Sequence, residues 1–150
     1  MLHIVNKSHA ETSSLQSCLR LAKAGSALLL IEDACDALGT RIAGRQAGTF
    51  GAAATYSFYP AHHMTTGEGG MIATDSPELA VRIRRTRSFG TDGPESPQAG
   101  VNAKLSEVSA AVGLAMLSRL EQETAARRSI RDRYRAALEH GMNAQSPLFN

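Results

Sequence analysis

Two adjacent histidines, His62 and His63, stand in a segment of polar and glycine residues, SFYPAHHMTTGEGG at 57–70. An imidazole gains and loses a proton near neutral pH, so a histidine in such a loop can act as a general acid or base. Metal binding is a weaker alternative, because consecutive side chains in an extended loop point apart and no further cluster of His, Cys or Asp has metal-site spacing. Two solvated histidines without a chemical role are the remaining interpretation.

Two further polar side chains could contribute to the same site. Asp33 directly follows the expected strand 27–32, where an enzyme can hold a carboxylate against the ring nitrogen of a cofactor. The alternative is that Asp33 caps a turn, as aspartate commonly does. Ser57 could donate a hydrogen bond to a phosphate, and the backbone amides of residues 67–70 could help to shape the site.

The elements that must position these side chains alternate between strands and helices. Residues 2–5 are a short apolar run, residues 11–24 have helical spacing closed by Gly25, and residues 27–32 are expected to form a buried strand. This order is typical of a parallel sheet, whose ligands gather at the carboxyl ends of the strands. The sequence therefore predicts an α/β fold with Asp33 at a ligand-binding edge.

The middle of the chain is expected to add two strands. Residues 39–51 contain several glycines and few periodic apolar positions, which predicts an irregular loop. Strands are expected at 53–58 and 70–74. Residues 91–100 contain two prolines and two glycines and are expected to form a surface loop.

Helices dominate the remainder. Ser76 is a suitable N-cap and Pro77 a suitable first helical residue for a helix over 79–87 that ends at Gly90. Residues 106–140 have helical periodicity, as one long helix or as a bent pair.

Composition narrows the functional classes. At 150 residues with 43% hydrophobic side chains, the chain is in the single-domain range. A net charge of +2, an aromatic content of 5% and the lack of tryptophan disfavour nucleic-acid binding. The arginines between residues 82 and 87 are interpreted as a solvated helix face.

The two cysteines and the apolar runs indicate the compartment. Cys18 and Cys35 lie far apart, without the pattern of a disulfide framework or a zinc site, so a reducing cytoplasm is expected. The longest apolar run, 27–31, is too short to cross a bilayer, and the N-terminus does not resemble a signal peptide. The sequence therefore predicts a soluble, cytoplasmic protein without a membrane segment.

Several ordered motifs carry a family resemblance. IEDACDALG, GTFG, SFYPAHHMTTGEGG and MIAT within 31–74, followed by GVNAKLSEVSAAVGLAMLSRLE at 100–121, resemble the DegT/DnrJ/StrS family of pyridoxal phosphate-dependent sugar aminotransferases and sugar dehydratases. The resemblance implies part of the large domain of the aspartate-aminotransferase-like fold (fold type I), with a mostly parallel sheet, flanking helices and a long C-terminal helix. Family members are well over twice as long, so residues 1–150 are expected to be a partial large domain, truncated at both ends and without the small C-terminal domain.

The residue at position 62 separates two branches of that family. Most members have there the lysine that binds pyridoxal phosphate covalently. A smaller branch, the nucleotide-activated 4-keto-6-deoxysugar 3-dehydrases, has histidine and works with pyridoxamine phosphate. SFYPAHH resembles that branch, and Asp36, in place of the glutamine or histidine of many aminotransferases, points the same way. The resemblance implies a sugar dehydratase of deoxysugar and polysaccharide biosynthesis.

The resemblance also implies a role for each site residue. His62 is the base that removes a proton from the cofactor methylene as the C3 hydroxyl leaves a nucleotide-activated 4-keto-6-deoxysugar. Asp33 pairs with the pyridine nitrogen of pyridoxamine or pyridoxal phosphate, and Asp36 lies near the ring hydroxyl. Ser57 holds the cofactor phosphate. Asn102 reaches a phosphate in the neighbouring subunit, because the sites of this family form at the interface of a homodimer.

One subgroup of the histidine branch binds a [2Fe-2S] cluster through four cysteines, of which the first matches Cys35. The loop after Gly90 contains no cysteine, so an intramolecular cluster is not expected. A cluster-independent dehydratase fits the sequence better.

Two alternatives stay open. The first is an aminotransferase-family protein that uses another amine, although none of its three lysines, Lys7, Lys23 and Lys104, lies in the histidine loop. The second is a non-catalytic, truncated remnant that dimerises or binds a cofactor without turnover.

Overall fold

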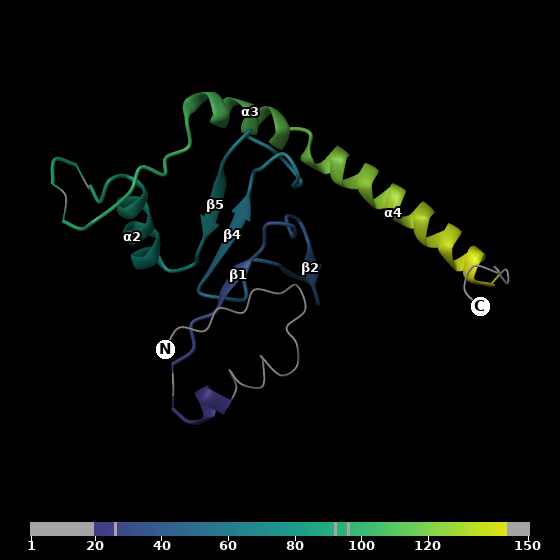
Figure 1. Cartoon of the computed structure of the whole chain (residues 1–150), viewed down its shortest axis with the longest axis horizontal. Coiled ribbons are helices and arrows are strands. Elements are labelled where there is room, and N and C mark those ends of the chain that lie inside the picture. The colour runs from purple at the N-terminus through teal and green to yellow at the C-terminus, as the bar shows by residue number, and fades with distance from the viewer. Residues whose placement is uncertain (1–19, 26, 92, 96, 144–150) are drawn as a thin grey trace.

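The computed structural model describes residues 20–25, 27–91, 93–95 and 97–143. Three strands form one sheet and two short strands form a separate hairpin, with helices on either side of them in the chain (Figure 1). The elements are β1 (Ile31–Asp33), β2 (Arg41–Ile42), β3 (Arg45–Gln46), β4 (Ala53–Ser57), β5 (Gly70–Ala73), α2 (Pro77–Arg87), α3 (Glu107–Leu117) and α4 (Leu120–Asn143).

The first expected strand and most of the first expected helix lie outside the described residues. Residues 20–23 are helical, and the N–H of Gly25 donates to the carbonyl of Ala22 at 3.0 Å. Gly25 has a φ of +88°, so the expected left-handed C-terminal cap is confirmed.

The sheet has the order β1-β4-β5. Strands β1 and β4 are parallel, with Asp33 opposite Thr55, which confirms the predicted parallel pair. Strand β5 runs antiparallel to β4, with Gly70 opposite Ser57. The segment that connects β4 to β5 carries His62, so it lies at the carboxyl end of β4.

The segment that connects β3 to β4 packs closely against the centre of the sheet. Ala54 and Tyr56 of β4 form a buried cluster with Ala34, and the Tyr56 hydroxyl donates to the carbonyl of Ala47 at 3.0 Å. A Cβ atom on Gly48 would lie 1.9 Å from that hydroxyl oxygen. Glycine at this position is therefore required by the close contact between loop and sheet.

Two sequence expectations are corrected in this region. Residues 27–32 were expected to be a buried strand, but pairing begins only at Ile31, and the side chain of Leu29 is 71% exposed. Among the described residues, β1 pairs only with β4. The expected irregular loop 39–51 contains the antiparallel hairpin β2–β3, whose turn residues Ala43 and Gly44 both have positive φ, as a tight hairpin requires.

Helix α2 begins as predicted. Ser76 is the N-cap, its Oγ accepts the N–H of Leu79 at 3.2 Å, and Pro77 is the first helical residue. The helix ends at Arg87 rather than at Gly90, whose φ is +79°. A Cβ atom on Gly100 would lie 2.0 Å from the Gly90 nitrogen, so the two ends of the following loop pass each other at backbone contact.

Loss of the N-cap gives the first testable prediction. Ser76→Ala removes the oxygen that accepts the Leu79 N–H, and we expect the free energy of unfolding to fall by about 1 kcal/mol. Urea unfolding followed by circular dichroism measures this change. Ser76→Thr keeps an acceptor and is the matched control; an equal loss in both variants would contradict the capping role.

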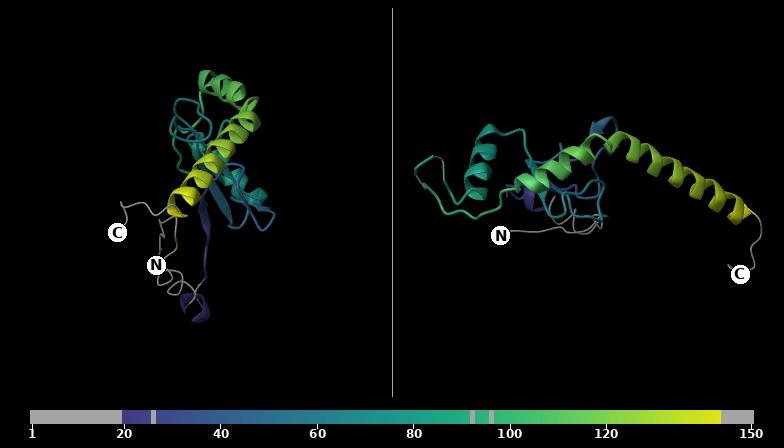
Figure 2. Two further views of the ribbon diagram at one scale, coloured as in Figure 1. Left: turned by 90° about the vertical axis from the view of Figure 1, so that its right-hand side faces the viewer. Right: turned by 90° about the horizontal axis from the view of Figure 1, so that it is seen from above.

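The C-terminal helical region is a bent pair, the second of the two predicted forms. Helix α3 ends at Leu117, and the N–H of Arg119 donates to the carbonyl of Met116 at 3.1 Å before α4 begins. Helix α4 has 24 residues, about 36 Å at 1.5 Å per residue, and it projects away from the sheet (Figures 1 and 2). No helix in the described part of the chain is long and apolar enough to cross a membrane.

Candidate active site

Asp33 lies at the carboxyl end of β1, as the sequence predicts. Its Oδ1 accepts the N–H of Cys35 at 3.2 Å, so the turn-capping role is also present. The pKa of Asp33 lies below its ordinary value, because the thiol and the amide of Cys35 donate to the carboxylate and the His62 imidazole lies near it; partial burial acts in the opposite direction. Asp33 is therefore ionised at neutral pH and exposed at the strand end.

The thiol of Cys35 takes part in the same turn. Its Sγ lies 3.9 Å from the carbonyl oxygen of Thr55. Its hydrogen bond to Asp33, burial and the aspartate charge raise the pKa of the thiol. Cys35 is thus a protonated donor at neutral pH rather than a nucleophile.

His62 and Asp36 form the central contact of the site. The Nδ1 of His62 lies 2.7 Å from the Oδ1 of Asp36, and the two residues come from loops that follow the adjacent strands β4 and β1. The His62 side chain is 21% exposed and that of Asp36 is 84% exposed. A carboxylate at Nδ1 favours the tautomer with its proton on Nδ1, which leaves Nε2 able to accept a proton.

Glu32 is a residue that the sequence analysis missed. Its carboxylate accepts the backbone N–H groups of Gly48, Phe50 and Gly51 at 2.5–2.7 Å. Burial acts to raise the pKa of Glu32, but these three amides and the charge of Arg45 outweigh it, so the pKa lies below its ordinary value. One sequence signal could have identified Glu32. It is an acidic residue next to Asp33, followed along the chain by a glycine-rich segment whose backbone amides need acceptors.

Ser57 occupies the last position of β4, at the same edge of the sheet as Asp33. Its Oγ accepts the N–H of Tyr59 at 3.2 Å. The connecting segment closes on itself, because Phe58 donates to the carbonyl of Gly69 and Thr66 donates to the carbonyl of Phe58, both at 2.9 Å. The amide of Gly67 donates to the Thr65 hydroxyl, so one of the amides expected to help shape the site forms its hydrogen bond within the loop.

Asn102 lies on a different segment from the Asp33–Asp36–His62 group. It forms an isolated antiparallel bridge with Ser88, just after α2. The structure thus brings together Asp33, Asp36 and His62, places Ser57 on the neighbouring strand end, and places Asn102 beside the end of α2.

The positions of the described residues bear on two alternatives, a lysine that binds the cofactor and a metal site. Of the lysines in the described part of the chain, Lys23 precedes β1, and the Nζ of Lys104 lies 5.2 Å from the ring centroid of Phe89. Neither stands in the loop that carries His62. Across residues 20–143, apart from the three undescribed positions, no group of three or more His, Cys, Asp or Glu side chains is arranged to hold a metal ion.

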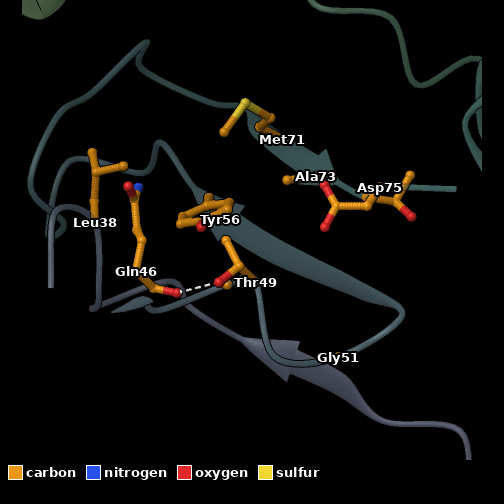
Figure 3. Close-up of a pocket in the computed structure, with 10 residues that line it drawn as sticks. Leu38, Gln46, Thr49, Gly51, Tyr56, Met71, Ala73 and Asp75 are labelled. Carbon is orange, nitrogen blue, oxygen red and sulfur yellow. Dashed lines mark hydrogen bonds between the residues drawn. The ribbon is translucent and has the colours of Figure 1, made fainter. Parts of the chain in front are cut away.

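A separate cavity of about 260 Å³ lies between the hairpin and the sheet (Figure 3). Tyr56 and Met71 line it, together with Gln46, Thr49 and Asp75. Since side chains alternate along a strand, Tyr56 faces the side of β4 opposite to Thr55, which is the cross-strand neighbour of Asp33. The cavity therefore lies on the other face of the sheet from Asp33.

Comparison with known proteins identifies the family. Residues 10–148 match the profile of the DegT/DnrJ/EryC1/StrS aminotransferase family. The chain belongs to this family. Members of the DegT/DnrJ/EryC1/StrS family depend on pyridoxal phosphate, and the relatives act on nucleotide-linked sugars.

Individual relatives agree with this assignment. The chain is 41% identical over 106 residues to the GDP-perosamine synthase of Caulobacter vibrioides, a match that covers 69% of this chain and 29% of that protein. It is 55% identical over 65 residues to the dTDP-4-dehydro-2,6-dideoxy-D-glucose 3-dehydratase of Saccharopolyspora spinosa, covering 43% of this chain and 14% of the relative. The chain thus spans less than a third of the length of these curated relatives.

The fold agrees as well. A crystal structure of a DegT/DnrJ/EryC1/StrS aminotransferase from Brucella abortus superposes with a TM-score of 0.73 at 32% identity, covering 88% of this chain and 35% of that one. The expected fold class, a partial α/β domain of the pyridoxal phosphate-dependent aminotransferase fold, is therefore confirmed.

Proposed function

We propose that the chain holds pyridoxamine or pyridoxal phosphate and serves the 3-dehydration of a nucleotide-activated 4-keto-6-deoxysugar, with His62 as the proton-transfer base. The observation that carries the proposal is the 2.7 Å contact between His62 Nδ1 and Asp36 Oδ1. The 55% identity to a 3-dehydratase over 65 residues supports the same reaction class.

The chemistry of the described side chains fits such a cofactor. Asp33 is an ionised, exposed carboxylate, suited to a protonated ring nitrogen. Ser57 offers a hydroxyl for the phosphate at the adjacent strand end, and Asp36, in the loop that follows Asp33, is suited to the ring hydroxyl. When bound, the cofactor supplies an electron sink for the sugar chemistry.

Proton transfer is the part that the chain's own residues perform. With its Nδ1 proton directed at Asp36, His62 presents Nε2 as the base, and the Asp36 carboxylate stabilises the imidazolium that forms. The proton can then return to the departing C3 oxygen from the same nitrogen.

The proposal includes an assembly and a place in the cell. We propose a cytoplasmic homodimer in which Asn102 contacts the phosphate held by the partner subunit. Residues 1–150 then form part of a large domain, and the small C-terminal domain of longer family members is not among them.

An aminotransferase is the second candidate function. The family name and the 41% identity to GDP-perosamine synthase favour it. The two candidates differ in whether a lysine binds the cofactor covalently. A chain that binds cofactor or dimerises without turnover is the third outcome.

Absorbance spectroscopy distinguishes the three. The purified chain is mixed with pyridoxal phosphate or with pyridoxamine phosphate, with and without borohydride. Retention of pyridoxamine phosphate without a covalent bond, followed by turnover of a nucleotide-linked 4-keto-6-deoxysugar, is the expected result. A lysine adduct fixed by borohydride overturns the histidine-base reaction, and failure to retain either cofactor favours the non-catalytic chain.

A further inference from the structure

Helix α3 packs against the second half of the loop that carries His62. Met64 and Thr66 are buried, and a Cβ atom on Gly113 of α3 would lie 2.9 Å from Thr66 Cγ2 and 4.0 Å from Met64 Cε. Close approach of the helix backbone therefore fixes the second half of the loop. It does not by itself fix the orientation of the peptide group next to His62.

Helix α4 contacts the loop at that peptide group. The Nη1 of Arg127, in the second turn of α4, donates to the backbone carbonyl of His63 at 3.0 Å. The Nδ1 of the His63 side chain is buried and has no hydrogen-bond partner among the described residues. The His63 carbonyl is thus bound by α4, while Nδ1 of its half-buried side chain is shielded from solvent.

The hydrogen bond from Arg127 to the His63 carbonyl restrains the part of the loop around His62, which has few other restraints. The His62 N–H donates to the carbonyl of Tyr59 at 3.0 Å, and the imidazole is held by Asp36, whose own side chain is almost fully exposed. An exposed partner is free to change rotamer, so it restrains the imidazole less than a packed one does. The Arg127 contact acts on the backbone one residue away and restricts rotation there.

We infer that Arg127 is a positioning residue for His62, which fixes the His63 carbonyl and thereby keeps the imidazole directed at Asp36. The role in catalysis rests on the proposed function, but the orientation of the imidazole does not. The geometry can therefore be tested without turnover.

Nuclear magnetic resonance of the chain tests the inference. The imidazole resonances of His62 are assigned by their loss in His62→Gln. In Arg127→Ala we expect them to move toward those of a solvated histidine and the His62 amide to exchange with solvent faster, on the order of tenfold. Arg127→Lys keeps a cation that can donate to a single carbonyl, and we expect it to restore most of the wild-type spectrum and exchange rate.

Arg131→Ala is the matched control, because Arg131 lies one turn further along α4 and its guanidinium pairs with Asp132 on the same helix. We expect it to leave the His62 resonances unchanged. Protection of the Tyr56 amide in β4 reports that each variant is folded. Unchanged His62 resonances in a folded Arg127→Ala chain would overturn the inference, as would an equal shift in Arg131→Ala. Failure of the proposed function would show separately, as undiminished dehydration by His62→Ala.

Discussion

Replacing His62 by alanine is expected to lower the rate of sugar dehydration by about a hundredfold to ten-thousandfold, the usual contribution of a general base. The His62 side chain contacts Asp36 near the surface and is not part of the buried cluster around Ala54. The free energy of unfolding should therefore change little. The measurement is turnover of a nucleotide-linked 4-keto-6-deoxysugar by the chain loaded with pyridoxamine phosphate, together with urea unfolding of both proteins.

Asp36→Asn tests the same pair from its other side. An amide in place of the carboxylate no longer stabilises the imidazolium and can select the wrong tautomer, so we expect a smaller but clear loss of turnover. Asp132→Asn makes the identical change in an exposed pair on α4 and should retain wild-type turnover. Full dehydrase activity in His62→Ala would rule out His62 as the base.

Glu32→Ala is expected to cause the largest loss of stability, about 2–4 kcal/mol at pH 7. The carboxylate accepts three backbone N–H groups, and hydrogen bonds to a charged acceptor contribute more than neutral ones. Without this carboxylate, the amides of Gly48, Phe50 and Gly51 lose their common acceptor. The segment that connects β3 to β4 then loses its attachment to β1. Urea unfolding measures the change.

The contribution of Glu32 should depend on pH. The folded pKa of Glu32 is below its unfolded value, so the stabilisation is fully present above roughly pH 4–5 and is lost as the pH falls through the folded pKa. Asp33, whose pKa is also lowered, contributes to the acid loss of stability in both proteins and so cancels from their difference. The difference in unfolding free energy between wild type and Glu32→Ala should therefore shrink on acidification.

Glu139→Gln provides the comparison for this prediction. Glu139 pairs with Arg135 on the exposed surface of α4, where such pairs contribute only about 0.3–0.5 kcal/mol. A loss in Glu32→Ala no larger than in Glu139→Gln would refute the proposed attachment of the loop. A wild-type to Glu32→Ala difference that stays constant with pH would refute the role of the charge.

Local rules were sufficient for much of the fold. The β4 and β5 strands are predicted from short runs that flank glycine-rich segments, and the start of α2 follows from the Ser76–Pro77 pair. The position of Asp33 follows from the chain order alone, because the residue after a parallel strand lies at the carboxyl edge of the sheet.

Features that depend on distant segments could not be predicted in this way. The exposure of residues 27–31 depends on which strands cover β1, and a sequence window contains no information about them. The contact between Asp36 and His62 joins residues 26 positions apart, and its distance depends on how two loops close. The same holds for Glu32, whose partners are backbone amides that any residue type carries.

The close passage of Gly90 and Gly100 has a consequence for protein engineering. A Cβ atom on Gly90 would lie 1.8 Å from the Gln98 carbonyl oxygen, and one on Gly100 would lie 2.0 Å from the Gly90 nitrogen. The N–H of Phe89 also donates to the carbonyl of Val101 at 3.0 Å, so the two ends of the loop are joined at its base. Lengthening a surface loop costs little once its ends are fixed. An epitope or a small binding domain inserted between Gly93 and Pro94 should therefore be accommodated without displacing α2 or α3, which makes this turn a natural attachment point for labels.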